Sequence, residues 1–220
     1  MARPVDCEEI VVSDARTAIL DRIDRALKTA RIPVVSAGAR GVQPGEFGPS
    51  GTLIDRFVAE ARALGVEAFV EGSPDAVRAR LALLTDGRRV LAWNPDRLPY
   101  GADAVVSGAA RGSSPRDEQA AADVGVTGCH GAIAETGSLA LLSLPGCPRA
   151  ASLLPPLHVA LVRPDNFFFG MGDFFEARTD QIAAASNCTF VTGPSRTADI
   201  ELSLTIGVHG PARVIVIVGP

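Results

Sequence analysis

The chain has 220 residues, of which 47% are hydrophobic and 21% charged, and its formal net charge is −4. This acidic balance argues against nucleic-acid binding, which normally leaves a basic footprint, and one Trp with one Tyr offers little stacking surface for bases. No segment approaches the roughly 20 apolar residues of a membrane span, and the N-terminus lacks a signal-peptide core, so we expect a cytoplasmic protein.

The N-terminal part of the chain is predicted to be a helix followed by a loop. Apolar residues recur at helical spacing over residues 15–30, with Ser13 as a plausible N-cap. Residues 32–38 could be a short strand or loop, and the Gly/Pro-rich stretch 38–51 has no core of its own. A chain of this length is expected to form one domain, with residues 1–50 as a helical and loop extension.

Helices and strands then alternate to the end of the chain. Helices are predicted over residues 53–64, 73–87, 114–123 and 172–185. Strands are predicted over residues 66–71, 88–94, 102–108, 157–162, 188–193 and 213–219. The helix after Ser73 has the best-defined start, with Pro74 at its first position. This alternation is typical of an α/β fold, with a mostly parallel Rossmann-like sheet, helices on both faces and ligands beyond the carboxyl ends of the strands.

A first polar turn, within residues 127–152, carries one carboxylate between two small or apolar runs. Glu135 lies between Ala-Ile-Ala and Leu-Ala-Leu-Leu, and is followed by Thr136, Gly137 and Ser138. Burial of an ionised carboxylate is costly, so apolar surroundings would favour its protonated form and suit it to general acid–base work. The alternative is that Glu135 accepts backbone hydrogen bonds and fixes the turn.

A second polar turn follows the predicted strand 188–193 and continues into a Gly-Val-His-Gly-Pro segment that contains His209. Its backbone and hydroxyl donors, together with one guanidinium, suit a carboxylate or a phosphate. Alternatively, the hydroxyls cap a short helix and Asp199 pairs with Arg196. The anion-binding candidates in this turn are Gly193, Ser195, Arg196, Thr197 and Asp199.

We expect the two turns to converge, so that Glu135 faces the hydroxyls and the arginine of the second turn across a shared pocket. Glu135 and His209 are the catalytic candidates. His130 precedes the first turn, whereas His158 begins a strand and is predicted to be half-buried. No His-x-x-x-His spacing supports a metal site, and the glycine-rich phosphate-binding and dinucleotide-binding motifs are absent.

The cysteines and phenylalanines leave alternatives open. Cys7, Cys129, Cys147 and Cys188 contain no Cys-x-x-Cys pair, so neither a zinc nor an iron–sulfur site is indicated on this chain. Cys129 is predicted to be a buried thiol, with a nucleophile as the alternative. Five of the nine phenylalanines lie within residues 166–176, either as core packing or as an exposed patch that docks a partner or closes as a lid.

With these residues in view, the chain resembles the lactate-utilisation protein C family (LutC/YkgG), single-domain members of the LUD-domain group. The matching segments are residues 132–138, 152–162, 192–201 and 207–211. The resemblance implies a fold similar to the sugar-phosphate isomerases, glucosamine-phosphate deaminases and CoA-transferases. It also implies a subunit of a system that oxidises L-lactate to pyruvate together with iron–sulfur partner proteins. The clusters would lie on those partners, and this chain would bind no cofactor.

Two other functions are compatible with the same residues. The chain could be a stand-alone CoA-transferase-like or isomerase-like enzyme on a phosphate-bearing or CoA-bearing substrate, with Glu135 at the reaction centre. It could also be a non-catalytic assembly subunit. In each case the expected ligand is a small anion, such as lactate, pyruvate or a phosphate compound. Turnover by the isolated chain would favour the enzyme, whereas co-purification with cluster-bearing proteins would favour a subunit.

Overall fold

The computed structural model describes residues 12–29, 52–198 and 204–220 of the chain. The chain divides into two units, Met1–Phe47 and Gly48–Pro220, and each is described by itself. Among the described residues, no helix is both long and apolar enough to cross a membrane.

The first unit contains helix α1 (Val12–Thr29), which confirms the predicted N-terminal helix. The predicted N-cap is wrong, because the helix begins one residue before Ser13. The large apolar side chains of α1 are exposed: Ile19, Leu20, Ile23 and Leu27. The predicted strand over residues 32–38 and the loop that follows it lie outside the described residues, as does Cys7.

The second unit is built around a five-stranded parallel sheet, in the order β1-β11-β6-β3-β2. Its strands are β1 (Glu67–Val70), β2 (Val90–Ala92), β3 (Val124–Thr127), β6 (Leu157–Val162) and β11 (Arg213–Val218). The central strands β3 and β6 are buried along their whole length, as expected for apolar runs covered on both faces. The predicted mostly parallel α/β sheet is confirmed.

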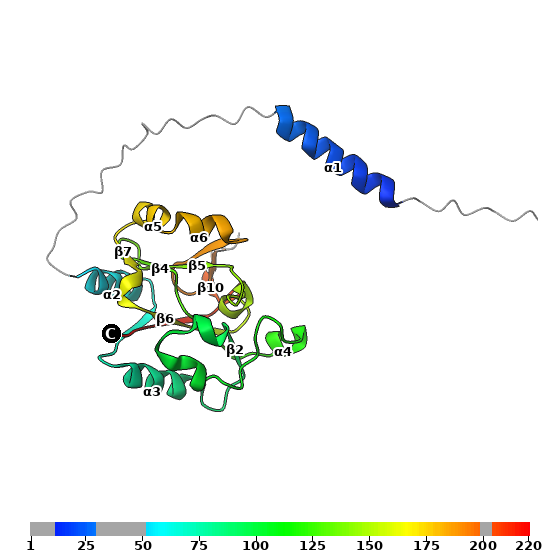
Figure 1. Ribbon diagram of the computed structural model, residues 1–220. Coiled ribbons are helices and arrows are strands. Elements are labelled where there is room, and N and C mark those ends of the chain that lie inside the picture. Colours follow the sequence, from blue (N-terminus) through cyan, green and yellow to red (C-terminus); the bar gives the residue numbers. More distant parts are fainter. Residues whose placement is uncertain (1–11, 30–51, 199–203) are drawn as a thin grey trace, which may run out of the picture. The chain divides into compact units, whose positions relative to one another are not determined.

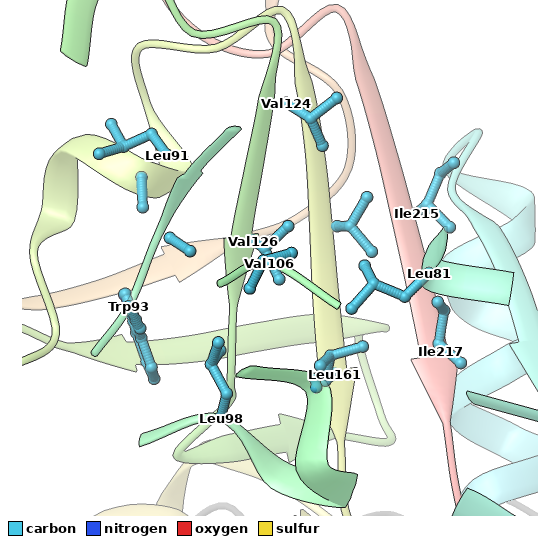
Figure 2. Close-up of a cluster of buried hydrophobic side chains, with 14 of the residues drawn as sticks. Leu81, Leu91, Trp93, Leu98, Val106, Val124, Val126, Leu161, Ile215 and Ile217 are labelled. Carbon is cyan, nitrogen blue, oxygen red and sulfur yellow. The ribbon is translucent and has the colours of Figure 1, made fainter. Parts of the chain in front are cut away.

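Helices α2 (Leu53–Ala63) and α3 (Pro74–Thr85) cover opposite faces of this sheet, as Figure 1 shows. Alternate residues of β6 and β11 point to the two sides, because side chains of a strand alternate. Helix α3 packs on one side through Val77 and Leu81, against a cluster that contains Leu161 and Ile217 (Figure 2). The predicted start of α3 is confirmed, since the Ser73 Oγ accepts a hydrogen bond from the Ala76 N–H at 3.2 Å.

A second, four-stranded sheet packs beside α2 and was not predicted as such. Its order is β7-β4-β5-β8, with β4 (Gly131–Ile133), β5 (Ser138–Leu142), β7 (Phe167–Phe168) and β8 (Cys188–Val191). Strand β8 confirms the predicted strand over residues 188–193. The hairpin β4–β5 escaped prediction because its buried residues do not alternate with polar ones, and period-two alternation is the usual strand signal.

Helices α5 (Met171–Ala177) and α6 (Thr179–Ala184) cover the outer side of the second sheet (Figure 1). A single helix over residues 172–185 was predicted, but the backbone leaves helical geometry at Arg178, with φ −117° and ψ 16°. Much of the phenylalanine-rich segment packs into the core. Phe167 and Phe174 are buried, whereas Phe175 remains 43% exposed.

The remaining described elements are short. The predicted strand over residues 102–108 is wrong, because the 3₁₀ helix η2 (Pro99–Ala104) and a turn occupy this region. Helix α4 (Arg116–Ala120) is shorter than predicted, and β9 (Arg196–Ala198) pairs with β10 (Leu204–Ile206) as a two-stranded sheet. Three further 3₁₀ turns are η1 (Pro95–Arg97), η3 (Arg149–Ser152) and η4 (Pro164–Asn166).

Candidate functional site

The first predicted polar turn is the connection between β4 and β5, residues 134–137. Gly137 has φ +63°, and a Cβ there would lie 2.5 Å from the backbone N of Ala61 in α2, so the turn fits closely against that helix. The Glu135 N–H donates to the Phe169 carbonyl at 2.9 Å, but the Glu135 side chain is exposed. The expectation that its apolar neighbours bury this carboxylate is therefore wrong, and its catalytic role stays a prediction.

In the second predicted turn, the arginine is already engaged. The Arg196 guanidinium donates to the Leu64 carbonyl at 2.6 Å, where it stabilises the C-terminal end of α2. Gly193, with φ +92°, lies against the same carbonyl. The Ser195 N–H donates to the carbonyl of Pro211 at 2.9 Å. This arrangement holds the second turn against α2.

The remaining candidates of this segment are not gathered around Arg196 by any described contact. Thr197 lies in β9, Asp199 falls outside the described residues, and His209 is exposed in the bend 207–210. The anion-binding role of this turn and the catalytic role of His209 therefore stay predictions.

The two turns do approach each other through a chain of hydroxyl groups. The Thr136 Oγ1 donates to the Ser138 Oγ at 2.8 Å, and the Ser138 Oγ lies 2.8 Å from the Thr192 Oγ1. This chain links β5 to the end of β8. Within the described residues, no hydrogen bond or ion pair joins Glu135 to Arg196. These hydrogen bonds therefore link the two strands, and a shared pocket between Glu135 and Arg196 stays a prediction.

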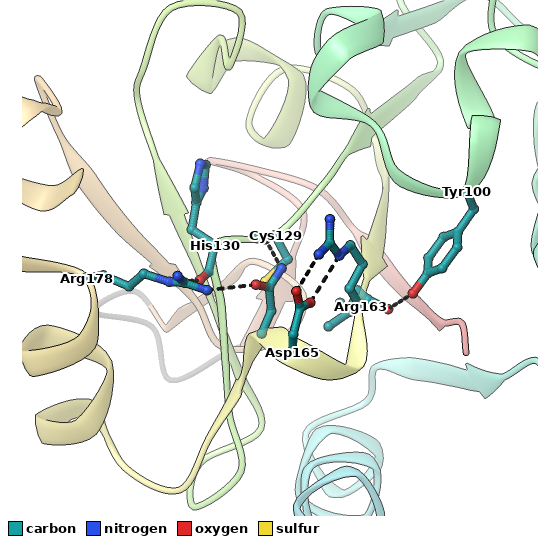
Figure 3. A network of polar contacts seen from close by, with 8 residues as sticks. Tyr100, Cys129, His130, Arg163, Asp165 and Arg178 are labelled. Atoms are coloured by element: carbon teal, nitrogen blue, oxygen red, sulfur yellow. Dashed lines mark hydrogen bonds and ion pairs between the residues drawn. The ribbon is translucent and has the colours of Figure 1, made fainter. Parts of the chain in front are cut away.

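A cavity of about 330 Å³ lies at the carboxyl ends of the parallel strands, and we call it the strand-edge cavity. The segments that follow β2, β3 and β6 line it, together with the junction of α5 and α6 (Figure 3). Its charged and polar side chains are Asp96, Arg97, His130, Arg163, Asp165, Asn166, Arg178 and Gln181. Parallel α/β sheets bind their ligands at this edge, so the cavity is the candidate functional site.

The break between α5 and α6 directs Arg178 into the cavity. Its Nε donates to the His130 carbonyl at 3.3 Å, and one terminal nitrogen donates to the Asn166 Oδ1 at 2.9 Å (Figure 3). Asn166 is itself fixed, because its Nδ2 donates to the Cys129 carbonyl at 2.6 Å. These acceptors are all uncharged. Within the described residues, no carboxylate pairs with Arg178.

The other two arginines of the cavity each have a neighbouring carboxylate. The Arg163 Nε donates to the Asp165 Oδ1 at 3.0 Å, and a second nitrogen of the same guanidinium also contacts this carboxylate. The Arg97 Nε lies 3.1 Å from the Asp96 Oδ2. Arg178 therefore carries the positive charge that is best placed to attract an anion into the cavity.

His130 presents a neutral hydrogen-bond donor. Its Nδ1 accepts the Leu142 N–H at 3.1 Å, which leaves the proton of the neutral ring on Nε2. The ring lies against Trp93, with centroids 5.1 Å apart. Burial, together with the positive charges of Arg178 and Arg97, lowers the pKa of His130 to about 4. At neutral pH the cavity thus combines guanidinium groups with an imidazole N–H.

The two thiols that line the cavity are not poised as nucleophiles. Burial raises the pKa of Cys129 to about 12 and that of Cys147 to about 11. The Cys129 Sγ also donates to the Gly131 carbonyl at 2.8 Å. Both thiols are therefore protonated at neutral pH, which supports the interpretation of Cys129 as a buried thiol. Within the described residues, no group of three or more His, Cys, Asp or Glu side chains is arranged to hold a metal ion.

Sequence reasoning passed over most of this cavity. Arg97, Arg163 and Asn166 all lie within five residues of the carboxyl end of a parallel strand, and that position is the signal that could have identified them. Arg178 had no comparable signal, since the helical pattern over residues 172–185 does not reveal the break. His130 was noted only for its place before the first turn.

Comparison with known proteins supports one family. The LUD domain model matches residues 82–218, a range that contains every polar side chain named for the strand-edge cavity. A lactate utilization protein C from Exiguobacterium sp. is 31% identical over 137 residues, which cover 58% of this chain and 60% of that relative. A lactate utilization protein C from Macrococcus caseolyticus is 30% identical, with 68% of this chain and 71% of the relative covered.

One solved structure is similar in fold. It is the crystal structure of a DUF162 family protein from Deinococcus radiodurans, with a TM-score of 0.61 and 24% sequence identity. The match covers 76% of this chain and 96% of that one. This chain spans about three fifths of the Exiguobacterium relative, at 60% of its length.

Proposed function

The chain belongs to the LUD domain family, and we propose that it is a subunit of an L-lactate utilisation system whose strand-edge cavity binds the carboxylate of a small 2-substituted acid. Lactate and pyruvate are the ligands of this class that the system would handle. The names of the relatives from Exiguobacterium and Macrococcus support the process, and the chemistry of the cavity supports the ligand.

The arrangement of Arg178 carries this proposal. A guanidinium that is held by two uncharged acceptors keeps free N–H groups for a carboxylate, and a planar fork suits that group. His130 lines the same cavity, and its Nε2–H would provide a second donor, suited to an oxygen on the neighbouring carbon. A small carboxylate with an oxygen on its second carbon would use both groups.

The oxidation of L-lactate to pyruvate is assigned in this proposal to the assembled system. Removing two electrons from lactate requires a redox group, and we propose that iron–sulfur partner proteins provide it. A cytoplasmic location belongs to the same proposal, since Cys129, Cys147 and Cys188 are free.

Arg178→Ala is expected to weaken binding of pyruvate or L-lactate to the isolated chain by at least about tenfold, because a charge-assisted hydrogen bond to the ligand is lost. Arg178→Lys is expected to have an intermediate affinity, since it keeps the positive charge but lacks the planar guanidinium. Isothermal titration calorimetry measures both, and circular dichroism checks that the variants are folded.

Arg116→Ala is the matched control, because Arg116 is an exposed arginine of α4 that does not line the cavity. It should bind like the wild type. Glu135→Gln tests the remaining catalytic candidate in the same assay and in lactate oxidation by the assembled system. Equal binding by Arg178→Ala and Arg116→Ala would refute the proposed site. Purification from lactate-grown cells without any cluster-bearing partner would refute the proposed assembly.

A further inference from the structure

We propose that the strand-edge cavity prefers 2-oxo acids to 2-hydroxy acids, so that the chain binds the product side of lactate oxidation. This inference rests on the proposed function, because it states which of the two anions the cavity favours. It follows from the hydrogen-bonding state of one side chain, His130, and from the way the acceptors around it are already used.

The backbone fixes the tautomer of His130. The group that meets its Nδ1 is the main-chain N–H of Leu142 at 3.1 Å, and an amide N–H only donates. The Nδ1 must therefore accept, and the proton of the neutral ring lies on Nε2. Within the described residues, the Nε2 has no hydrogen-bond partner, and His130 is one of the residues that line the cavity. The ring can therefore donate a hydrogen bond to a ligand from Nε2 but has no free lone pair to accept one.

A second proton on the ring is disfavoured. Protonation would place an N–H on Nδ1, where it would face the N–H of Leu142. Burial together with the charges of Arg178 and Arg97 lowers the pKa of His130 to about 4, in agreement with this geometry. The ring therefore remains a neutral donor over the physiological pH range.

A 2-oxo acid suits this donor better than a 2-hydroxy acid does. With the carboxylate at Arg178, a keto oxygen on the second carbon accepts the Nε2–H and brings no hydrogen of its own. A hydroxyl in the same place accepts too, but its proton then needs an acceptor. The carbonyls of Cys129 and His130 already accept from Asn166 and Arg178, and the carboxylates of Asp96 and Asp165 each lie beside an arginine, so this proton would have to share an engaged acceptor or reach the amide oxygen of Gln181.

The same geometry limits the chemistry of His130. Oxidation of lactate to pyruvate removes the hydroxyl proton, the hydrogen on the second carbon and two electrons. A base for the hydroxyl proton needs a lone pair, which the Nε2 of this tautomer lacks. His130 therefore recognises a carbonyl oxygen and does not abstract the proton, which fits a division of labour in which oxidation occurs on a partner.

The test uses the only tryptophan of the chain as a reporter, since Trp93 packs against His130 and lines the cavity. Quenching of its fluorescence is measured during titration of the folded chain with pyruvate, L-lactate and propionate. Pyruvate is expected to bind about tenfold more tightly than L-lactate, which corresponds to one unpaired donor. Equal or tighter binding of L-lactate would overturn the inference and leave the proposed function standing.

The variant that isolates the cause is His130→Asn. The asparagine amide oxygen can accept the Leu142 N–H, but the variant has no donor at the former Nε2 position. The difference between pyruvate and L-lactate is expected to disappear in this variant and to persist in Arg116→Ala. If the difference persists in folded His130→Asn, the inference is wrong. If none of the three acids binds to the wild type, the proposed function falls and the inference with it. If His130→Asn does not fold, the wild-type ratio alone decides.

Discussion

Gly125→Ala is expected to lower the free energy of unfolding by about 3 kcal/mol, because β3 has no room for a side chain at this position. A Cβ on Gly125 would overlap the carbonyl oxygen of Ala151 and lie 2.9 Å from its carbonyl carbon, with the Pro155 Cγ at 3.2 Å. The obstacle is backbone from η3 and cannot rotate away. In a chain of this size, the melting temperature should fall by roughly 6–12 °C.

Gly72→Ala is the matched control for this substitution. A Cβ on Gly72 would meet nothing within 4 Å, and its φ lies outside the left-handed region. Its free energy of unfolding should change by no more than about 0.5 kcal/mol. Urea unfolding of both variants decides the matter, and a Gly125→Ala protein as stable as Gly72→Ala would show that η3 does not pack on β3 as described. The result also bears on the cavity, since β3 leads directly into residues 128–130.

The parts of the fold that sequence reasoning predicted are those specified by local patterns. Strand β6 was predicted with its observed bounds, because a continuous apolar run between polar and proline-rich segments indicates a buried strand. The start of helix α3 was predicted from Ser73 and Pro74, since the cap and the fixed φ of proline both act within one turn. Neither prediction required knowledge of distant contacts.

The parts that were missed depend on pairing at a distance. Strand β5 pairs with β8, where Leu142 lies opposite Cys188, so its identity as a strand is decided by a segment far along the chain. The break at Arg178 is also non-local, because the side chain leaves the helical pattern to reach His130 and Asn166. Periodicity carries no information about either contact.

For the candidate site, a general rule about sheet edges was useful, whereas the particular residues chosen from the sequence were not those that line the cavity. The rule that ligands bind at the carboxyl edge of a parallel sheet leads to the strand-edge cavity, but it was applied to two turns that pack against α2. Glu135 drew attention because its sequence neighbours are apolar. In a hairpin, however, those neighbours belong to the two strands, and the turn residue between them is free to face solvent. Apolar neighbours in sequence therefore did not mean burial for Glu135.

We expect His158 to cause a strong loss of stability in mild acid. It was expected to be half-buried, but the structure buries it completely in the sheet, with its Nε2 at 2.9 Å from the Thr127 Oγ1. Its Nδ1 is buried without a partner among the described residues. A protonated ring would need acceptors for two N–H groups, and burial accordingly lowers the pKa of His158 from 6.5 to about 4.

The direction of the stability change follows from proton uptake by the unfolded chain. Between pH 6.5 and 4 the unfolded chain protonates this histidine and the folded chain does not. The free energy of unfolding therefore falls as pH falls through this window, and the contribution of His158 is fully present above it. From pH 7 to 4.5 the loss due to His158 should be roughly 2–3 kcal/mol. His158→Gln, which can still bond to Thr127 but does not titrate, should lose less stability over the same range by this amount.

The measurement is the free energy of unfolding in urea at pH 7 and at pH 4.5, compared within each protein. His158→Gln is expected to be less stable than the wild type at pH 7, because a buried amide replaces a ring shaped to the site, so only the change with pH is diagnostic. Exposed His209 provides the control, and His209→Gln should follow the wild type. Parallel losses in the wild type and His158→Gln would mean that solvent reaches His158. The pH range stays above the window in which the ion pair of Asp123 with Arg89 is lost, because that pair lowers the pKa of Asp123 to about 2.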